Sequence, residues 1–148
     1  DQGWSPFQSA ASNGHIAVVH ALLADPRVDV NAQDKEGWSP FKSAAYSGRL
    51  DVVQALISDL RVDINAQDKE GWCPLMNAAW NGHLEVVQTL VLDPRVKTDL
   101  RNTRGETALT LAKRNKQQAV VDVLQAHSRV RPKPRTVLWK TLMRPWRP

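Results

Sequence analysis

The residues best suited to metal binding or catalysis are few and widely separated in this sequence. Metal sites in proteins combine three or four Cys, His or carboxylate ligands, often in close pairs such as C-x-x-C, and that spacing does not occur. The phosphate-binding pattern G-x-x-x-x-G-K-[ST], the dinucleotide pattern G-x-G-x-x-G and the hydrolase pattern G-x-S-x-G are absent as well. We therefore expect no metal, no cofactor and no enzymatic activity. The only cysteine is Cys73, and the four histidines are His15, His20, His83 and His127.

Aromatic side chains are the residues here that indicate binding. Trp4, Trp38 and Trp72 recur at one constant interval along the chain, and the same interval separates Tyr46 from Trp80. Tryptophan and tyrosine dominate binding hot spots because they are large, rigid and partly polar. Aromatic faces also attract cations, by about 0.5–2 kcal/mol for each contact. Such a set of rings predicts a surface that recognises a partner rather than one that transforms a substrate.

The elements that must position these rings repeat along the chain. Gly3, Gly37, Gly71 and Gly105 recur at the same interval as the tryptophans, and "GWSPFQSAASNGH", "GWSPFKSAAYSGR", "GWCPLMNAAWNGH" and "GETALTLAKRNKQ" align around them without a gap. A fixed period, here the step from Gly3 to Gly37, predicts a stacked array in which each unit buries its apolar face against its neighbours. We place the copies at about 1–33, 34–67, 68–101 and 102–127.

Each copy contains the signals of two short helices. Ser5, Ser39 and Thr107 are good N-caps, and proline follows the two serines at the first helical position. A glycine ends the first helix, and a second apolar helix follows, which stops at an Asp-Pro-Arg triplet at Asp25 and Asp93 because proline cannot continue it. Cys73 stands where the third copy needs its cap, and losing such a cap costs about 1 kcal/mol. The third copy is therefore expected to be the least stable.

These motifs resemble the ankyrin repeat, with its pattern T-P-L-H-x-A-A-x-x-G-H followed by an amphipathic helix and a V-N-A turn. The resemblance covers residues 1 to about 127 and implies an all-α solenoid of helix-turn-helix pairs with β-hairpin-like turns. Each copy here is one residue longer than the usual repeat of the family. The family histidine after the leucine is replaced by Gln8, Lys42, Met76 and Thr110.

The resemblance also implies which residues line the concave binding face. Residues after the hairpin glycine and at the end of the first helix point into it in this family. Trp4, Trp38 and Trp72 would form a ladder there, or would pack on one another and on the hairpins. The position of Tyr46 and Trp80 varies between copies, which favours a binding role. The predicted partner-binding residues are Trp4, Trp38, Tyr46, Trp72, Trp80, Glu36, Glu70, Arg104 and Arg114.

Asn31 and Asn65 match the turn asparagine of the family. Such residues are candidates for an asparaginyl hydroxylase in ankyrin proteins, so the resemblance implies possible hydroxylation here. The stronger interpretation is local, because asparagine tolerates turn conformations and hydrogen-bonds to the nearby backbone.

The two ends of the array differ in character. The first copy is as apolar as the internal ones, which predicts a fragment or the C-terminal part of a longer array, since terminal repeats need a polar outer face. The fourth copy is polar and has the character of a cap. The tail from Ser128 to Pro148 contains seven basic and no acidic side chains, so the net charge of +5 belongs to this tail and the rest of the chain has a net charge of −2.

The tail permits three interpretations besides having no role. It could dock on the array of its own or a neighbouring chain, bind a separate partner, or contact an anionic surface. Docking is favoured, because Arg and Trp side chains suit an aromatic and partly acidic groove. Nucleic acid and membrane are disfavoured as main partners, because the array lacks a basic stripe and the apolar stretch is short. The candidate docking residues are Leu138, Trp139, Leu142 and Trp146.

We therefore interpret the chain as a non-catalytic interaction module for a protein or peptide that contains basic or proline residues. The alternatives are a reader of basic or methyl-lysine tails, a regulatory fragment of a larger enzyme or channel, and a structural spacer. The single Cys73 fits a reducing compartment, so we expect an intracellular protein of the cytoplasm or nucleus.

Overall fold

The computed structural model describes residues 3–130, which fold into eight α-helices arranged in four pairs. No β-strand is present within this range. The pairs follow one another at the predicted period, which confirms the all-α repeat architecture. The helices are α1 (Pro6–Asn13), α2 (Ile16–Ala24), α3 (Pro40–Ser47), α4 (Leu50–Ile57), α5 (Pro74–Asn81), α6 (Leu84–Leu92), α7 (Ala108–Arg114) and α8 (Gln118–Val130).

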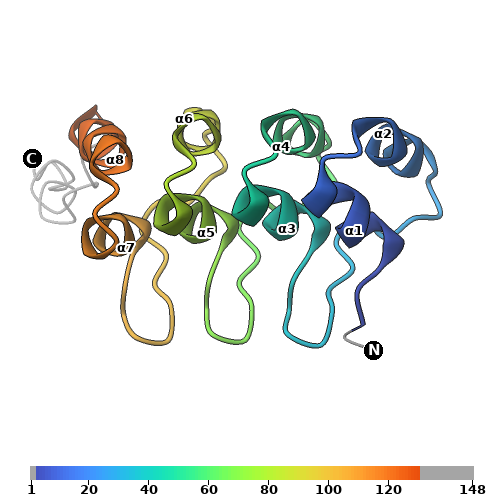
Figure 1. Ribbon diagram of the computed structural model, residues 1–148, viewed down its shortest axis with the longest axis horizontal. Coiled ribbons are helices and arrows are strands. Elements are labelled where there is room, and N and C mark those ends of the chain that lie inside the picture. Colours follow the sequence, from blue (N-terminus) through green and yellow to red (C-terminus); the bar gives the residue numbers. More distant parts are fainter. Residues whose placement is uncertain (1–2, 131–148) are drawn as a thin grey trace, which may run out of the picture.

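The helices form two parallel layers (Figure 1). The first helices of the pairs, α1, α3, α5 and α7, pack side by side in one layer, and the second helices form the other. Long loops between the pairs extend from the first layer in the same direction. The main contacts between helices of different repeats join neighbouring repeats, as expected for a solenoid.

Capping explains why the first helices begin where they do. The Ser5 and Ser39 side chains accept hydrogen bonds from the backbone N–H three residues later, and Pro6 and Pro40 occupy the first helical position. Cys73 makes no such bond, so α5 begins without a side-chain cap. The missing side-chain cap is confirmed, and the lower stability of the third repeat stays a prediction.

The loop tips at Gly37 and Gly71 lie so close to the next loop that they require glycine. Gly71 has a φ of 81°, and a Cβ atom placed on it would lie 2.8 Å from the Asn102 Cα of the next loop. A backbone bond from Thr103 N to Glu70 O, 2.9 Å long, joins the same two loops. Any side chain at Gly71 would therefore separate them.

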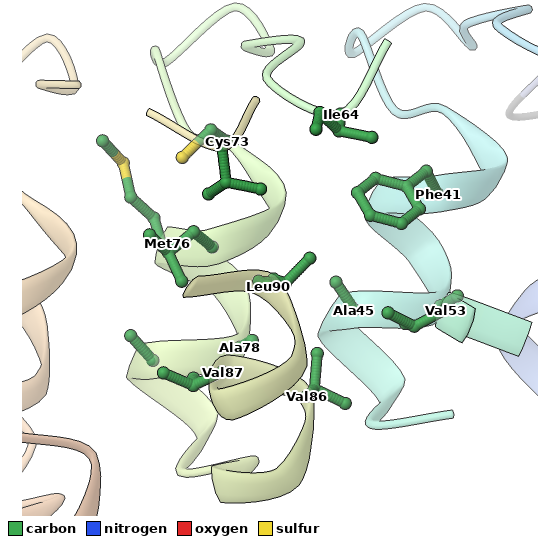
Figure 2. Close-up of a cluster of buried hydrophobic side chains, with 14 of the residues drawn as sticks. Phe41, Ala45, Val53, Ile64, Cys73, Met76, Ala78, Val86, Val87 and Leu90 are labelled. Atoms are coloured by element: carbon green, nitrogen blue, oxygen red, sulfur yellow. The ribbon is translucent and has the colours of Figure 1, made fainter. Parts of the chain in front are cut away.

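The core is continuous from repeat to repeat. Between the second and third repeats, Phe41, Leu56, Leu75 and Leu90 are all at most 2% exposed. Figure 2 shows Phe41 and Ala45 of α3 facing Leu90 and Val86 of α6 there, whereas the Met76 side chain is directed away from α3. The array is thus held by apolar contacts between repeats as well as within them.

The fourth repeat departs from the others at its helix junction. Lys116 replaces the glycine and still adopts the left-handed conformation, with a φ of 57°. Asn115 becomes the C-cap of α7. The helix α8 continues to Val130, past the residue where the sequence places the start of the tail. The predicted docking residues Leu138, Trp139, Leu142 and Trp146 lie outside the described residues.

Candidate functional site

A groove on the surface of the second and third repeats collects most of the predicted aromatic residues. It has a volume of about 310 Å³. We call it the aromatic groove. Its lining residues are Glu36, Trp38, Tyr46, Asp68, Lys69, Glu70, Trp72, Asn77 and Trp80.

The rings in the groove are arranged as pairs within one repeat. The ring centroids of Trp38 and Tyr46 lie 5.1 Å apart with an interplanar angle of 66°. Those of Trp72 and Trp80 lie 6.0 Å apart at 84°. Both are edge-to-face contacts, a favourable arrangement for aromatic rings. Each loop tryptophan therefore packs on the last turn of its own first helix. A ladder of contacts between successive tryptophans is not found among the described residues.

The residues at this pair of positions explain why the first and fourth repeats do not line the groove. In the first repeat Ser12 replaces the helix aromatic and hydrogen-bonds Ser47 at 2.9 Å, so Trp4 has no ring partner in its own repeat and remains 48% exposed. In the fourth repeat both aromatic residues are replaced, by Glu106 and Arg114, which form an ion pair. Trp4 and the fourth repeat thus flank the groove and do not line it.

Arg114 nevertheless contacts the edge of the site. Its guanidinium carbon lies 5.3 Å from the centroid of the Trp80 ring. Hydrogen bonds from Asn102 and Arg114 lower the pKa of Glu106, which keeps the ion pair charged. The other predicted residue of this repeat, Arg104, is exposed and does not line the groove.

A buried ion pair, Lys42–Asp68, links the second and third repeats beside the groove. Lys42 is 1% exposed, and its ammonium group bonds to the Asp68 carboxylate and to the Trp72 carbonyl at 3.1 Å. The same group lies 4.8 Å from the centroid of the Trp38 ring. Burial lowers the pKa of Lys42 to about 8, while Cys73, Asp34 and Glu70 act in the opposite direction. Lys42 therefore ties one tryptophan of the groove to the loop that carries the next.

The sequence pattern did not identify this pair or its equivalents. Gln8 makes the corresponding bonds one repeat earlier, to Asp34 at 3.2 Å and to the Trp38 carbonyl at 2.6 Å. Met76 occupies the position in the third repeat, and the following loop carries Asn102 instead of aspartate. A polar residue in the family's histidine position, Gln8 or Lys42, is thus matched by an aspartate in the following loop, and the apolar Met76 by an asparagine. That correlation was the available signal.

Asn77 was also missed, although it lines the groove. It is 3% exposed, and its Nδ2 atom has no hydrogen-bond partner within residues 3–130. At the same position Ser43 donates to the Ser39 carbonyl of its own helix at 3.0 Å. A buried donor without a partner costs free energy, so Asn77 can supply a hydrogen bond to a group that enters the groove.

The charge of the groove favours a cationic ligand. Glu36 and Glu70 are exposed carboxylates on its rim, and Asp68 is compensated by Lys42. Lys69 is the only basic residue among those that line the groove. Aromatic faces beside carboxylates attract positive groups by both electrostatic and cation–π interactions.

Asn31 and Asn65 lie away from the aromatic groove and hold adjacent loops together. The Asn31 side chain donates to Arg61 O at 2.7 Å and accepts from Asp63 N at 2.7 Å. Asn65 makes the same two bonds one repeat later, to Arg95 O and from Lys97 N. Both amides are satisfied in the folded array, but by the backbone of the following repeat and not by the nearby turn, so the local interpretation is wrong about their partners. Their hydroxylation stays a prediction.

Clusters of metal ligands and membrane-spanning helices are not found among the described residues. Within residues 3–130 no three His, Cys, Asp or Glu side chains are placed to hold a metal ion. None of the helices in that range is long and apolar enough to span a bilayer. Burial raises the pKa of the Cys73 thiol, which keeps it protonated and poorly nucleophilic.

Comparison with known protein families identifies the repeat. One family model described as ankyrin repeats (many copies) matches residues 7–57 and again residues 41–91. A second model of the same description matches residues 73–112. Together the matches span more than half of the chain. None of the curated proteins compared with it matches.

Proposed function

Because the chain belongs to the ankyrin-repeat family, whose members generally act as protein-protein interaction modules, we propose that it binds a partner protein or peptide in the aromatic groove. The observation that carries this proposal is the gathering of four aromatic rings in one depression. Tyr46 is exposed and Trp38, Trp72 and Trp80 are half-buried, so part of each ring is accessible to a ligand. The fold itself does not require an aromatic residue at Tyr46, which is 46% exposed, since Ser12 takes its place in the first repeat.

We propose that the recognised segment is extended and contains a basic side chain, with proline favoured beside it. The exposed Glu36 and Glu70 carboxylates would pair with an arginine or lysine, whose cation would lie against the Trp72 ring. Proline stacks well on flat aromatic faces and costs little entropy to fix. Asn77 would donate its free N–H to a main-chain carbonyl of the segment.

Selection from a library of random displayed peptides tests this proposal. The matched variant is Tyr46→Ser with Trp80→Arg, which installs residues that the first and fourth repeats already carry at this position. Basic peptides should be enriched on the parent chain and should bind the variant at least ten-fold more weakly. Peptides that bind both proteins equally would place the interaction elsewhere, and no enrichment would favour a structural spacer or a regulatory fragment of a larger enzyme or channel.

Recognition of methylated lysine is a second candidate, favoured by the two edge-to-face ring pairs beside Glu70. Trimethyl-ammonium groups bind in aromatic cages because the cation is weakly hydrated. A selected peptide with trimethyl-lysine should then bind more tightly than its unmodified form. Equal affinity would exclude a cage and leave the general preference for cations.

The basic tail of the chain is a third candidate ligand for the groove. A synthetic peptide of residues 131–148, titrated into a chain that ends at Val130, should bind in the micromolar range if the tail of its own or a neighbouring chain occupies the groove. Loss of this binding in Trp80→Arg would locate it there. We also propose that the protein is located inside the cell, in the cytoplasm or nucleus, because its single cysteine, Cys73, is free and buried.

A further inference from the structure

The charge at the loop tips reverses between the third and the fourth repeat. Glu36, Glu70 and Arg104 occupy the same place in three successive repeats, each directly before the glycine of its loop. The two glutamates are exposed carboxylates on the rim of the aromatic groove, whereas Arg104 presents an exposed guanidinium. The surface next to the groove therefore offers a cation at the position where the groove offers anions.

The backbone holds these positions side by side. Thr103, the residue before Arg104, donates its backbone N–H to the Glu70 carbonyl at 2.9 Å. The equivalent bond joins the second and third repeats, from Lys69 N to Glu36 O at 3.3 Å. The loops also extend in the same direction from the layer of first helices (Figure 1). The positions of Glu36, Glu70 and Arg104 thus form one continuous row.

A second arginine lies beside this row in the fourth repeat. Arg114 occupies the position that Tyr46 and Trp80 hold in the preceding repeats, in the last turn of the first helix. Its guanidinium carbon lies 5.3 Å from the centroid of the Trp80 ring, so it adjoins the aromatic groove. Arg114 pairs with Glu106, yet its side chain is 51% exposed. Because a guanidinium has five N–H donors, Arg114 retains donors for a ligand.

This part of the fourth repeat retains one uncompensated positive charge. Both oxygens of the Glu106 carboxylate are engaged, since Oε1 pairs with Arg114 and Oε2 accepts from Asn102 Nδ2 at 2.9 Å. The Arg104 side chain makes no hydrogen bond and no ion pair within residues 3–130. Two guanidinium groups therefore face one carboxylate, and Arg104 is available to an anionic group.

The need of a terminal repeat for a polar surface does not explain this placement. Lys113 is exposed where its equivalent Ala79 is buried, so it belongs to the outer side of the fourth repeat. Arg104 and Arg114 instead occupy positions whose equivalents line the aromatic groove in both preceding repeats. Their positions place them on the binding surface.

We propose that Arg104 and Arg114 form a second subsite, which binds an acidic side chain of the same segment whose basic side chain lies at Glu70. This inference rests on the proposed function, because both subsites belong to one bound segment. Neighbouring helices of a packed layer lie about 8–10 Å apart, and an extended chain advances about 3.3 Å per residue. The acidic residue should therefore lie about three positions from the basic one. The partner is a segment of mixed charge, with its basic end at the third repeat and its acidic end at the fourth.

A displayed peptide library with one fixed lysine between random positions tests this inference. Peptides enriched on the parent chain should carry Asp or Glu about three positions from the lysine, always on the same side of it. Arg104→Glu installs the residue that the second and third repeats carry, and should replace the acidic preference by a basic one. Lys113→Glu makes the same change of charge on the outer side of the fourth repeat, and should leave the preference unaltered.

Charge exchange on one selected peptide gives the magnitude. Arg104→Glu should weaken its binding about five-fold, and replacing the acidic residue of the peptide by lysine should restore the affinity. The inference is overturned if the enriched peptides carry no acidic residue, accept one at any distance from the lysine, or respond equally to Lys113→Glu. Those peptides would still support the aromatic groove if Tyr46→Ser with Trp80→Arg weakens their binding. Failure to enrich any peptide would overturn the proposed function and this inference together.

Discussion

Exchanging the buried pair Lys42–Asp68 for the Met–Asn combination of the next repeat tests how the loops are tied to the helices. The double variant Lys42→Met with Asp68→Asn reproduces what the chain itself does at Met76 and Asn102. Met76 is 0% exposed at its position, so the methionine side chain fits there without a cavity. The perturbation removes two charges and should leave the packing intact.

The loop conformation should also survive the exchange. Asp68 Oδ1 accepts hydrogen bonds from Glu70 N and Trp72 N at 2.9 Å each. Asn102 Oδ1 accepts the equivalent pair at 3.0 Å, from Arg104 N and Glu106 N. An asparagine can therefore maintain the turn without a carboxylate.

The two single variants should behave very differently from the double variant. Either one leaves an unpaired charge at a site where the side chains are only 1% and 9% exposed, and breaking a buried pair in this way costs about 3–5 kcal/mol. Replacing the whole pair by uncharged residues is commonly neutral or stabilising. We therefore expect each single variant to lose about 3 kcal/mol or more of unfolding free energy, and the double variant to remain within about 1 kcal/mol of the parent.

Urea unfolding followed by circular dichroism measures these differences without relying on the nearby tryptophans. Gln8→Met with Asp34→Asn in the first repeat is the control cycle, because a neutral donor makes the same contacts there. The coupling energy between Gln8 and Asp34 should be clearly smaller than that between Lys42 and Asp68. A Lys42→Met variant as stable as the parent, or a double variant that loses the sum of the single losses, would refute the reasoning.

Three further predictions concern the stability of the array. Cys73→Ser should raise the unfolding free energy by about 0.5–1 kcal/mol, because a serine supplies the missing cap of α5, and a loss of stability in urea would contradict this. Between about pH 8 and 10.5 the unfolded chain binds a proton that folded Lys42 has released, so stability should rise with pH in this window. This rise should vanish in the double variant Lys42→Met with Asp68→Asn. A stability that falls with pH equally in the parent and the double variant would contradict the prediction. Gly71→Ala should destabilise more than Gly105→Ala in thermal unfolding, because both are left-handed but only the first has the next loop in the way, and equal losses would show that close approach is unimportant.

The fold could be predicted from the sequence because one period organises every element. The Ser-Pro caps and the glycines Gly14 and Gly48 predict where the first helices of the first two repeats begin and end, and the structure confirms these positions. Repetition makes such a prediction robust, since each signal occurs several times in the same place.

The groove was predicted only in part because its contacts depend on which residues meet in space. Trp38 lies on a loop and Tyr46 on the helix that follows it, and the period alone does not show that they pair. Trp4 was included because it matches the other tryptophans in position. It lies outside the groove because its helix partner is Ser12.

The polar contacts between repeats were harder to predict for a related reason. Lys42 and Asp68 lie in different repeats, and each alone is most simply interpreted as a solvated surface charge. Their burial follows from the stacking of one loop on the previous helix. Comparing the copies position by position, as for Met76 and Asn102, would have revealed the pair.

The most direct test of the central claim is to locate a bound ligand by nuclear magnetic resonance of the tryptophan indole N–H groups. A peptide selected on the parent chain would be titrated into isotope-labelled protein. Binding in the aromatic groove predicts that the signals of Trp38, Trp72 and Trp80 shift with a common dissociation constant, while that of Trp4 does not. Shifts confined to Trp4 or to tryptophans of the tail would show that the partner binds elsewhere, and would contradict it.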